Sequence, residues 1–130
     1  MNKIFAVAMS VLIGLSFAIA ATPSEKGDKI TVTGSIIDNR CAANHKDSLA
    51  SFIASHTKEC ALMPKCSASG YSIYSKDGAL VAFDKASYAK IKKFLKKPES
   101  TLAVVVTGTK EESGAIKLAT IKNEDQSATK

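Results

Sequence analysis

The stretch KITVTGSIID (residues 29–38) is the segment from which the fold prediction starts. Ile30, Val32, Gly34 and Ile36 alternate with polar residues, and this two-residue period is typical of a strand with one buried face. A glycine inside a strand has no side chain to pack, and it indicates a bulge or a sharp bend. The segment therefore predicts a first strand that changes direction at its glycine.

Four more strands are predicted further along the chain, in two pairs joined by turns. The first pair, 71–75 and 79–84, flanks the sequence KDG, in which the Asp-Gly dipeptide is a strong hairpin signal. The second pair, 101–110 and 115–122, flanks the turn sequence EESG. The chain therefore has five predicted strands.

Two helices are predicted between these strands. Residues 85–97 place an aromatic and two aliphatic side chains on one face, with lysines elsewhere. Residues 47–63 have a helical period throughout, and they predict one helix that ends before Pro64, because proline cannot sit inside a helix. The apolar stripe of this second helix consists of Leu49, Phe52, Ile53, His56, Cys60 and Met63.

The element order gives the fold class. Without the helix between the first two strands, it is the order of an OB-fold, a five-stranded barrel with a helix between the third and fourth strands. We therefore predict a mainly β, small five-stranded OB-fold-like barrel with a Cys/His-bearing helical insertion after strand 1. The single OB-like domain covers 29–122, between a flexible lead-in (21–28) and a polar tail (123–130).

The N-terminus has the pattern of a secretory signal peptide. MNK provides a positive start, IFAVAMSVLIGLSFAIA is an uncharged apolar run, and small residues lie at its end. The pattern predicts a signal peptide over 1–20, cleaved after Ala20, and a periplasmic or secreted mature protein. The alternative is an uncleaved membrane anchor, for which the run is at the short end of the required length. After cleavage, the sequence predicts no transmembrane segment.

The net charge of the chain is +6 at pH 7, and part of the excess lies in one stretch without carboxylates, residues 85–97. A basic surface attracts anionic partners. It predicts contact with an anionic cell-envelope component through Lys90, Lys92, Lys93, Lys96 and Lys97. A solvated helix face is the alternative, and export argues against nucleic acid as the partner. The sequence leaves the identity of the partner unknown.

All three cysteines and both histidines lie in the insertion after the first strand. Each histidine is four residues from a cysteine, and residues at that spacing share a helix face and can hold one ion. Three thiolates and one imidazole match a closed tetrahedral zinc site, and soft ligands equally suit copper. The predicted Zn or Cu ligands are Cys41, His45, His56, Cys60 and Cys66. Asp38 and Met63 are expected next to these ligands, without binding the ion directly.

Two other interpretations of the cluster stay open. A disulfide is the first, because thiols oxidise in exported proteins, and one bond among three cysteines leaves one thiol over. Three pairings are open, and each would clip the insertion. A nucleophilic Cys–His pair, 41 with 45 or 60 with 56, is the second. The sequence shows no orienting group and no oxyanion hole for such a pair, so a binding protein is favoured over an enzyme.

The motif G-x-x-x-D-x-x-C-x-x-x-H is followed by a His/Cys-bearing segment, a Gly-Tyr dipeptide, a hairpin and VVVTG (104–108). This arrangement resembles a family of small exported bacterial proteins, and it covers nearly all of the chain after the leader. The resemblance implies a secreted OB-like barrel with a Cys/His insertion, and it implies no particular activity. The matching residues are Gly34, Asp38, Cys41, His45, His56, Cys60, Cys66, Gly70 and Tyr71.

These patterns lead to three functional hypotheses. The leading one is an exported, non-enzymatic binding protein whose Cys/His cluster holds a zinc or copper ion, either structurally or for metal handling. The second is a disulfide-clipped OB-like module that binds an anionic envelope component. The third is a thiol-based redox protein.

Overall fold

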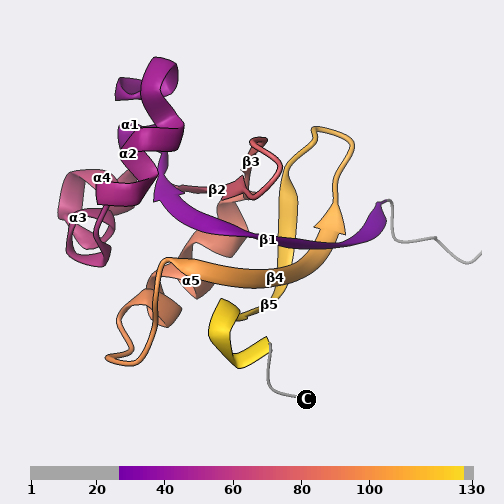
Figure 1. The fold of residues 1–130 in the computed structure, drawn as a ribbon. Coiled ribbons are helices and arrows are strands. Elements are labelled where there is room, and N and C mark those ends of the chain that lie inside the picture. Colours follow the sequence, from indigo (N-terminus) through magenta and orange to yellow (C-terminus); the bar gives the residue numbers. More distant parts are fainter. Residues whose placement is uncertain (1–26, 128–130) are drawn as a thin grey trace, which may run out of the picture.

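The computed structural model describes residues 27–127, which form a five-stranded antiparallel sheet with helices around it (Figure 1). The strands are β1 (Asp28–Asp38), β2 (Tyr71–Ser75), β3 (Leu80–Ala82), β4 (Ala103–Lys110) and β5 (Ile116–Asn123). Their order in the sheet is β3-β2-β1-β4-β5, with the longest strand at the centre. The five predicted strands are confirmed, and the predicted hairpin joins β2 to β3.

The central strand β1 pairs with two neighbouring strands along its length. Residues 28–35 pair with β4, and residues 34–38 pair with β2, so Gly34 lies where the two ladders overlap. A Cβ atom at Gly34 would lie 2.2 Å from the carbonyl oxygen of Tyr74. The glycine therefore permits the close approach of β2. The register shift of the sheet is not at this glycine but beside Gly108, between β4 and β5.

The sheet does not close into a barrel. Within the described residues, Phe83, which follows β3, forms an isolated parallel bridge with Ile116 at the start of β5, where Asp84 N donates to the Ile116 carbonyl over 2.9 Å. β3 has three residues, which pair with β2, and β3 and β5 form the two edges of the sheet. Helix accounts for about 39% and strand for about 36% of the structure. An open sheet with a comparable amount of helix therefore replaces the predicted mainly β barrel.

The insertion after β1 is a chain of short helices. It contains α1 (Asn39–Asn44), the 3-10 helix η1 (Lys46–Ser48), α2 (Leu49–Ser55), α3 (Lys58–Leu62) and α4 (Pro64–Ala68). The single helix predicted over 47–63 is wrong, because the chain is extended at His56 and Thr57, with ψ of 133° and 157°. Thr57 Oγ1 accepts a hydrogen bond from Cys60 N at 3.2 Å and so caps a new helix. Pro64 also begins a helix, in the first turn, where its missing N–H is not needed.

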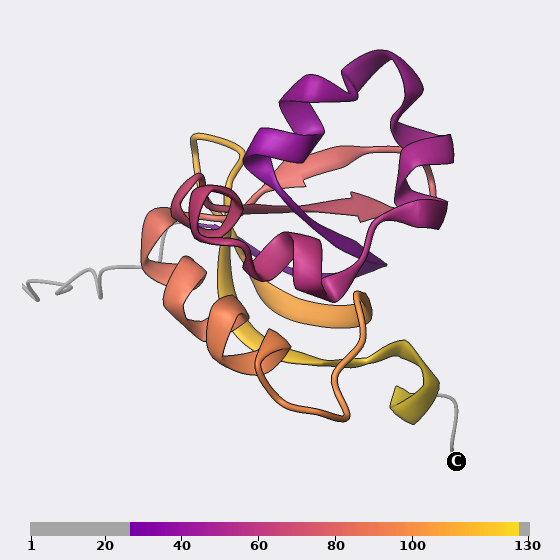
Figure 2. The same ribbon diagram turned by 90° about the vertical axis from the view of Figure 1, so that its left-hand side faces the viewer.

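The helix predicted over 85–97 is present, as η2 (Lys85–Ser87) and α5 (Tyr88–Leu95). Figures 1 and 2 show the insertion helices gathered at the end of β1, with α5 against the sheet and away from α1 and α2. Among the described residues, no helix is long and apolar enough to span a membrane.

Two apolar clusters are built on neighbouring residues of β1, because successive side chains of a strand point to opposite faces. Ile36 belongs to the main cluster, between the sheet and α5, and Ile37 to a smaller one under the insertion. The main cluster consists of Ile36, Ala61, Tyr71, Ile73, Phe83, Ile91, Leu95, Val104, Val106, Ile116 and Leu118. The smaller cluster consists of Ile37, Cys41, Ala42 and Cys66, with Leu49, Phe52, Ile53 and Cys60 packed against it.

The ordered chain runs beyond the predicted domain end at residue 122. Asn123 is buried at the end of β5, where its side chain accepts from Thr101 N at 2.9 Å and donates to the Glu99 carbonyl at 2.8 Å. The 3-10 helix η3 (Glu124–Ser127) follows. The predicted signal peptide, and all of the predicted lead-in except residues 27 and 28, lie outside the described residues.

Candidate metal centre

The site is built around Asp38, the last residue of β1, whose side chain is fully buried. Its Oδ1 accepts a hydrogen bond from Cys41 N at 2.9 Å and so caps the first turn of α1. Its Oδ2 lies 3.1 Å from His56 Nε2, at the break between α2 and α3. A carboxylate fixed at both oxygens therefore marks the junction between the sheet and the insertion.

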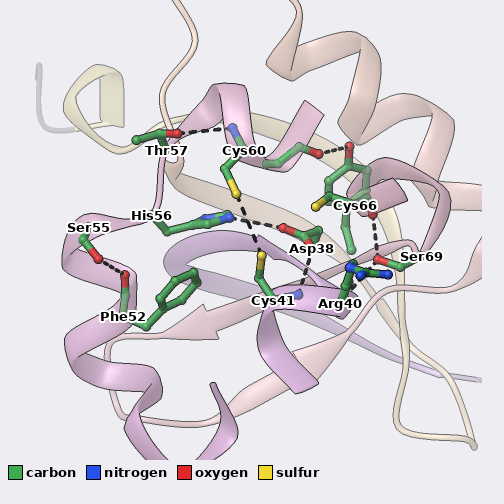
Figure 3. A network of polar contacts seen from close by, with 12 residues as sticks. Asp38, Arg40, Cys41, Phe52, Ser55, His56, Thr57, Cys60, Cys66 and Ser69 are labelled. Carbon is green, nitrogen blue, oxygen red and sulfur yellow. Dashed lines mark hydrogen bonds and ion pairs between the residues drawn. The ribbon is translucent and has the colours of Figure 1, made fainter. Parts of the chain in front are cut away.

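Three thiols converge on this carboxylate from three different helices. Cys41 comes from α1, Cys60 from α3 and Cys66 from α4. One carboxylate oxygen of Asp38 and the three sulfur atoms all lie within 4.8 Å of one another. Figure 3 shows the sulfur atoms of Cys41 and Cys60 directed toward each other beside Asp38. Cys41 and Cys66 are buried, whereas Cys60 is partly exposed, so the cluster reaches solvent on the α3 side.

The spacing of the thiols fits a shared ion. Four ligands at a Zn–S distance of about 2.3 Å place neighbouring sulfur atoms of a tetrahedron about 3.8 Å apart. The Sγ atoms of Cys41 and Cys60 are 3.9 Å apart. The two sulfur atoms of a disulfide are about 2.05 Å apart, and all three cysteines are free in the structure. The separation of these two sulfur atoms is therefore compatible with a shared ion and longer than a disulfide bond.

His56 lies behind the cluster and holds its carboxylate. A carboxylate oxygen only accepts, so the His56 Nε2–H donates to Asp38, and both side chains are buried. Among the described residues, His56 Nδ1 has no hydrogen-bond partner, although it is buried. A carboxylate that binds a metal is commonly held in this way by a second hydrogen-bonding group. We therefore assign His56 to orienting Asp38.

Crowding of acidic groups disfavours further negative charge at the site. Burial raises the pKa of the Cys41 thiol, and the hydrogen bond and charge of Asp38 raise it further. Burial and then the charge of Asp38 also raise the pKa of Cys66. Burial, followed by the charges of Asp38 and Cys66, raises the pKa of Tyr71 to about 12. A divalent cation would reverse this effect, because a bound ion favours the thiolate over the thiol.

The structure brings together some of the predicted site residues and separates others. All three cysteines meet, and Asp38, expected behind the ligands, lies among them. His45 stacks on Phe52 with ring centroids 3.8 Å apart and lies outside the group. His56 contacts the carboxylate and is likewise outside the group of converging ligand atoms. Met63 is 55% exposed. The backbone break after α2 explains why Asp38, and not His56, lies among the cysteines, because it turns His56 toward Asp38 and starts Cys60 on a new helix.

Sequence reasoning missed Lys58, which anchors the helix that carries Cys60. Its ammonium donates to the carbonyls of Lys97 (3.0 Å), Pro98 (3.3 Å) and Ser100 (2.8 Å), and it lies 3.3 Å from Ser100 Oγ. These acceptors belong to the loop between α5 and β4. Lys58 therefore ties α3 to the main body of the protein, and no pattern in the sequence indicates this contact.

Comparison of the chain with protein-family models, with curated proteins and with solved structures found no match.

Proposed function

We propose that this protein binds one zinc ion through the thiolates of Cys41, Cys60 and Cys66 and the carboxylate of Asp38. The observation that carries the proposal is the convergence of these four ligand atoms within 4.8 Å. The burial of Asp38 supports it, because a buried carboxylate is costly unless a cation or hydrogen bonds compensate it. His56 and the amide of Cys41 compensate it in part.

The oxygen ligand favours zinc over copper. Zinc accepts mixed sulfur and oxygen ligands in a tetrahedron, with Zn–O distances of about 2.0 to 2.2 Å. Cu(I) prefers soft sulfur ligands, so it would leave the charge of the buried carboxylate to its two hydrogen bonds alone. Met63, the additional sulfur expected near a copper ion, is 55% exposed. Binding of Cu(I) in preference to Zn²⁺ would count against this ligand set.

Four protein ligands leave no open coordination position, so this ion is held and does not catalyse. The ligands come from β1, α1, α3 and α4, and one ion would fasten the insertion to the end of the central strand. Because such a site forms only in the folded chain, binding energy becomes folding energy. We therefore infer a structural or metal-retaining role.

The direct test is metal titration of the protein expressed from the full sequence, reduced and stripped of metal. Native mass spectrometry should show one zinc ion, and Co²⁺ should give the strong thiolate charge-transfer bands of a cysteine-rich site. Cys41→Ser, Cys60→Ser and Cys66→Ser should each lose tight binding, whereas Met63→Leu, which removes an exposed sulfur, should keep it. Retention of binding by all three serine variants would eliminate the proposal.

We also propose an anionic partner for the lysine-rich α5 segment. Ile91 and Leu95 are buried, whereas Lys90, Lys93 and Lys96 are exposed. This division gives the segment an apolar inner face and a cationic outer face. Replacement of the exposed lysines by glutamine should weaken binding to anionic lipid vesicles and flatten its salt dependence. Vesicle binding that is insensitive to salt would refute this second candidate.

A further inference from the structure

We propose that the same site is controlled by oxidation: without an ion, Cys41 and Cys60 join as a disulfide, Cys66 stays a thiol, and the ion is excluded. This inference rests on the proposed zinc site, because it describes how that site is closed. The two sulfur atoms are 3.9 Å apart. They need to approach by about 2 Å to reach bonding distance.

The movement falls mainly to the Cys60 side chain, because Lys58 ties α3 to the loop after α5. α3 has five residues, and extended residues lie at both of its ends, Thr57 with ψ of 157° and Met63 with ψ of 141°. Rotation of the Cys60 side chain, with small backbone adjustments at these two ends, brings the sulfur atoms together while the Lys58 contacts are kept. Cys41, in contrast, is held by the amide contact to Asp38 and by its place in the smaller apolar cluster. The shift therefore takes place on the α3 side.

Exposure selects the thiol that meets the oxidant. Cys60 is partly exposed, whereas Cys41 and Cys66 are buried. A small disulfide from solvent therefore reaches Cys60 first. Cys41 then lies within 3.9 Å to resolve the mixed disulfide. Cys66 is fixed in α4, which begins at Pro64 and packs into the smaller cluster, and it is left as the thiol.

The chemistry balances with a small-molecule disulfide as the oxidant. The Cys60 thiolate attacks one sulfur of that disulfide, which forms a mixed disulfide and releases one small thiolate. Cys41 loses its proton to solvent and attacks the Cys60 sulfur, which breaks the mixed disulfide and releases the second small thiolate. The protein loses two electrons and two protons, and the small disulfide is reduced to two thiols.

Oxidation and metal binding are then mutually exclusive. The disulfide removes two of the four ligands and leaves only Asp38 and Cys66. Conversely, a bound ion occupies both sulfur atoms and protects them from attack. The site would therefore retain its ion under reducing conditions and release it under oxidising ones.

The test uses the protein expressed from the full sequence, reduced and either stripped of metal or saturated with Zn²⁺. Each form is incubated with oxidised glutathione, and the remaining thiols are counted by alkylation and intact mass. Metal-free protein should lose two hydrogens and keep one alkylatable thiol, and peptide mapping should join Cys41 to Cys60. Zinc-saturated protein should keep all three thiols. In metal-free protein, Cys66→Ser should still form the bond, and Cys60→Ser should not.

Two results would overturn the inference: a disulfide that includes Cys66, or equal thiol loss with and without zinc. The zinc titration of the reduced protein reports separately on the proposed function. If reduced protein binds zinc and the oxidised pairing is wrong, the control mechanism fails and the zinc site stands. If reduced protein does not bind zinc, both the proposed function and its control by oxidation fail.

Discussion

Replacement of Asp38 by asparagine tests whether this carboxylate binds the metal or only stabilises the fold. Asparagine has nearly the same volume, and its oxygen can still accept the bond from Cys41 N that caps α1. The contact to His56 can be kept with its direction reversed. The amide donates to His56 Nε2 when the imidazole carries its proton on Nδ1, the atom that has no partner among the described residues. We therefore expect the metal-free variant to keep its unfolding free energy within about 1 kcal/mol.

The metal-bound state should respond very differently to this substitution. Loss of a group behind a ligand lowers metal affinity by about 10- to 100-fold, and loss of a ligand itself should cost at least as much. That corresponds to about 1.4 to 2.8 kcal/mol or more. At a fixed free zinc concentration, the stabilisation by zinc falls by the same amount. Asp38→Asn should thus leave the unfolding free energy of the metal-free protein nearly unchanged and clearly lower that of the zinc-bound protein.

The assay is a chelator competition for zinc affinity, paired with urea unfolding with and without zinc. Asp47→Asn provides the matched control, because Asp47 is an exposed carboxylate in the same insertion. An Asp38→Asn variant that binds zinc as tightly as Asp47→Asn would show that the carboxylate is not a ligand. Destabilisation of the metal-free variant by several kcal/mol would instead make the contact between Asp38 and His56 the main reason for the buried pair.

Three further outcomes are expected. Lys58→Met should free α3 from the loop that follows α5 and weaken zinc binding about tenfold, or about 1.4 kcal/mol, in the chelator competition. Lys65→Met, which replaces an exposed lysine of α4, should leave the zinc affinity unchanged. Because the folded state raises the pKa of Cys41 and Cys66, these thiols contribute stability below their ordinary value of 9.0 that is lost as pH rises through the folded values. Urea unfolding of metal-free protein on either side of pH 9.0 should show this loss. We also propose that the chain is exported, so N-terminal sequencing of protein from its native compartment should begin at Ala21, and an intact N-terminus would refute cleavage.

The strands were predictable because their signals are local. Alternation in 29–38 and the Asp77-Gly78 turn act within a few residues, and the structure places β1 and the hairpin at those positions. Closure of the sheet was not predictable in the same way. It depends on pairing between β3 and β5, segments far apart in the chain, and no local pattern reveals that the two are joined only by the bridge between Phe83 and Ile116.

The helical insertion shows why a periodic pattern can mislead. The apolar stripe continues through His56 with the period of one helix, yet the chain breaks there. The available signal was Thr57, a residue that favours the position just before a helix, followed in the first turn by Glu59. This break determines which of the predicted residues converge. The cysteines could be grouped from the sequence alone, whereas the choice between Asp38 and a histidine depended on where the backbone turns.

The composition of the smaller apolar cluster indicates why the proposed ion would stabilise the insertion. Two of its four buried members are cysteines, Cys41 and Cys66, and its only large aliphatic one is Ile37. Apolar burial of this extent stabilises a segment of five short helices weakly, because each fully buried large aliphatic side chain contributes only about 1.5 to 3 kcal/mol. The main cluster, with α5 and all five strands, has no such shortage. Loss of the proposed ion should therefore loosen the insertion while the sheet persists, and the contacts of Asp38 and Lys58 should keep the two parts joined.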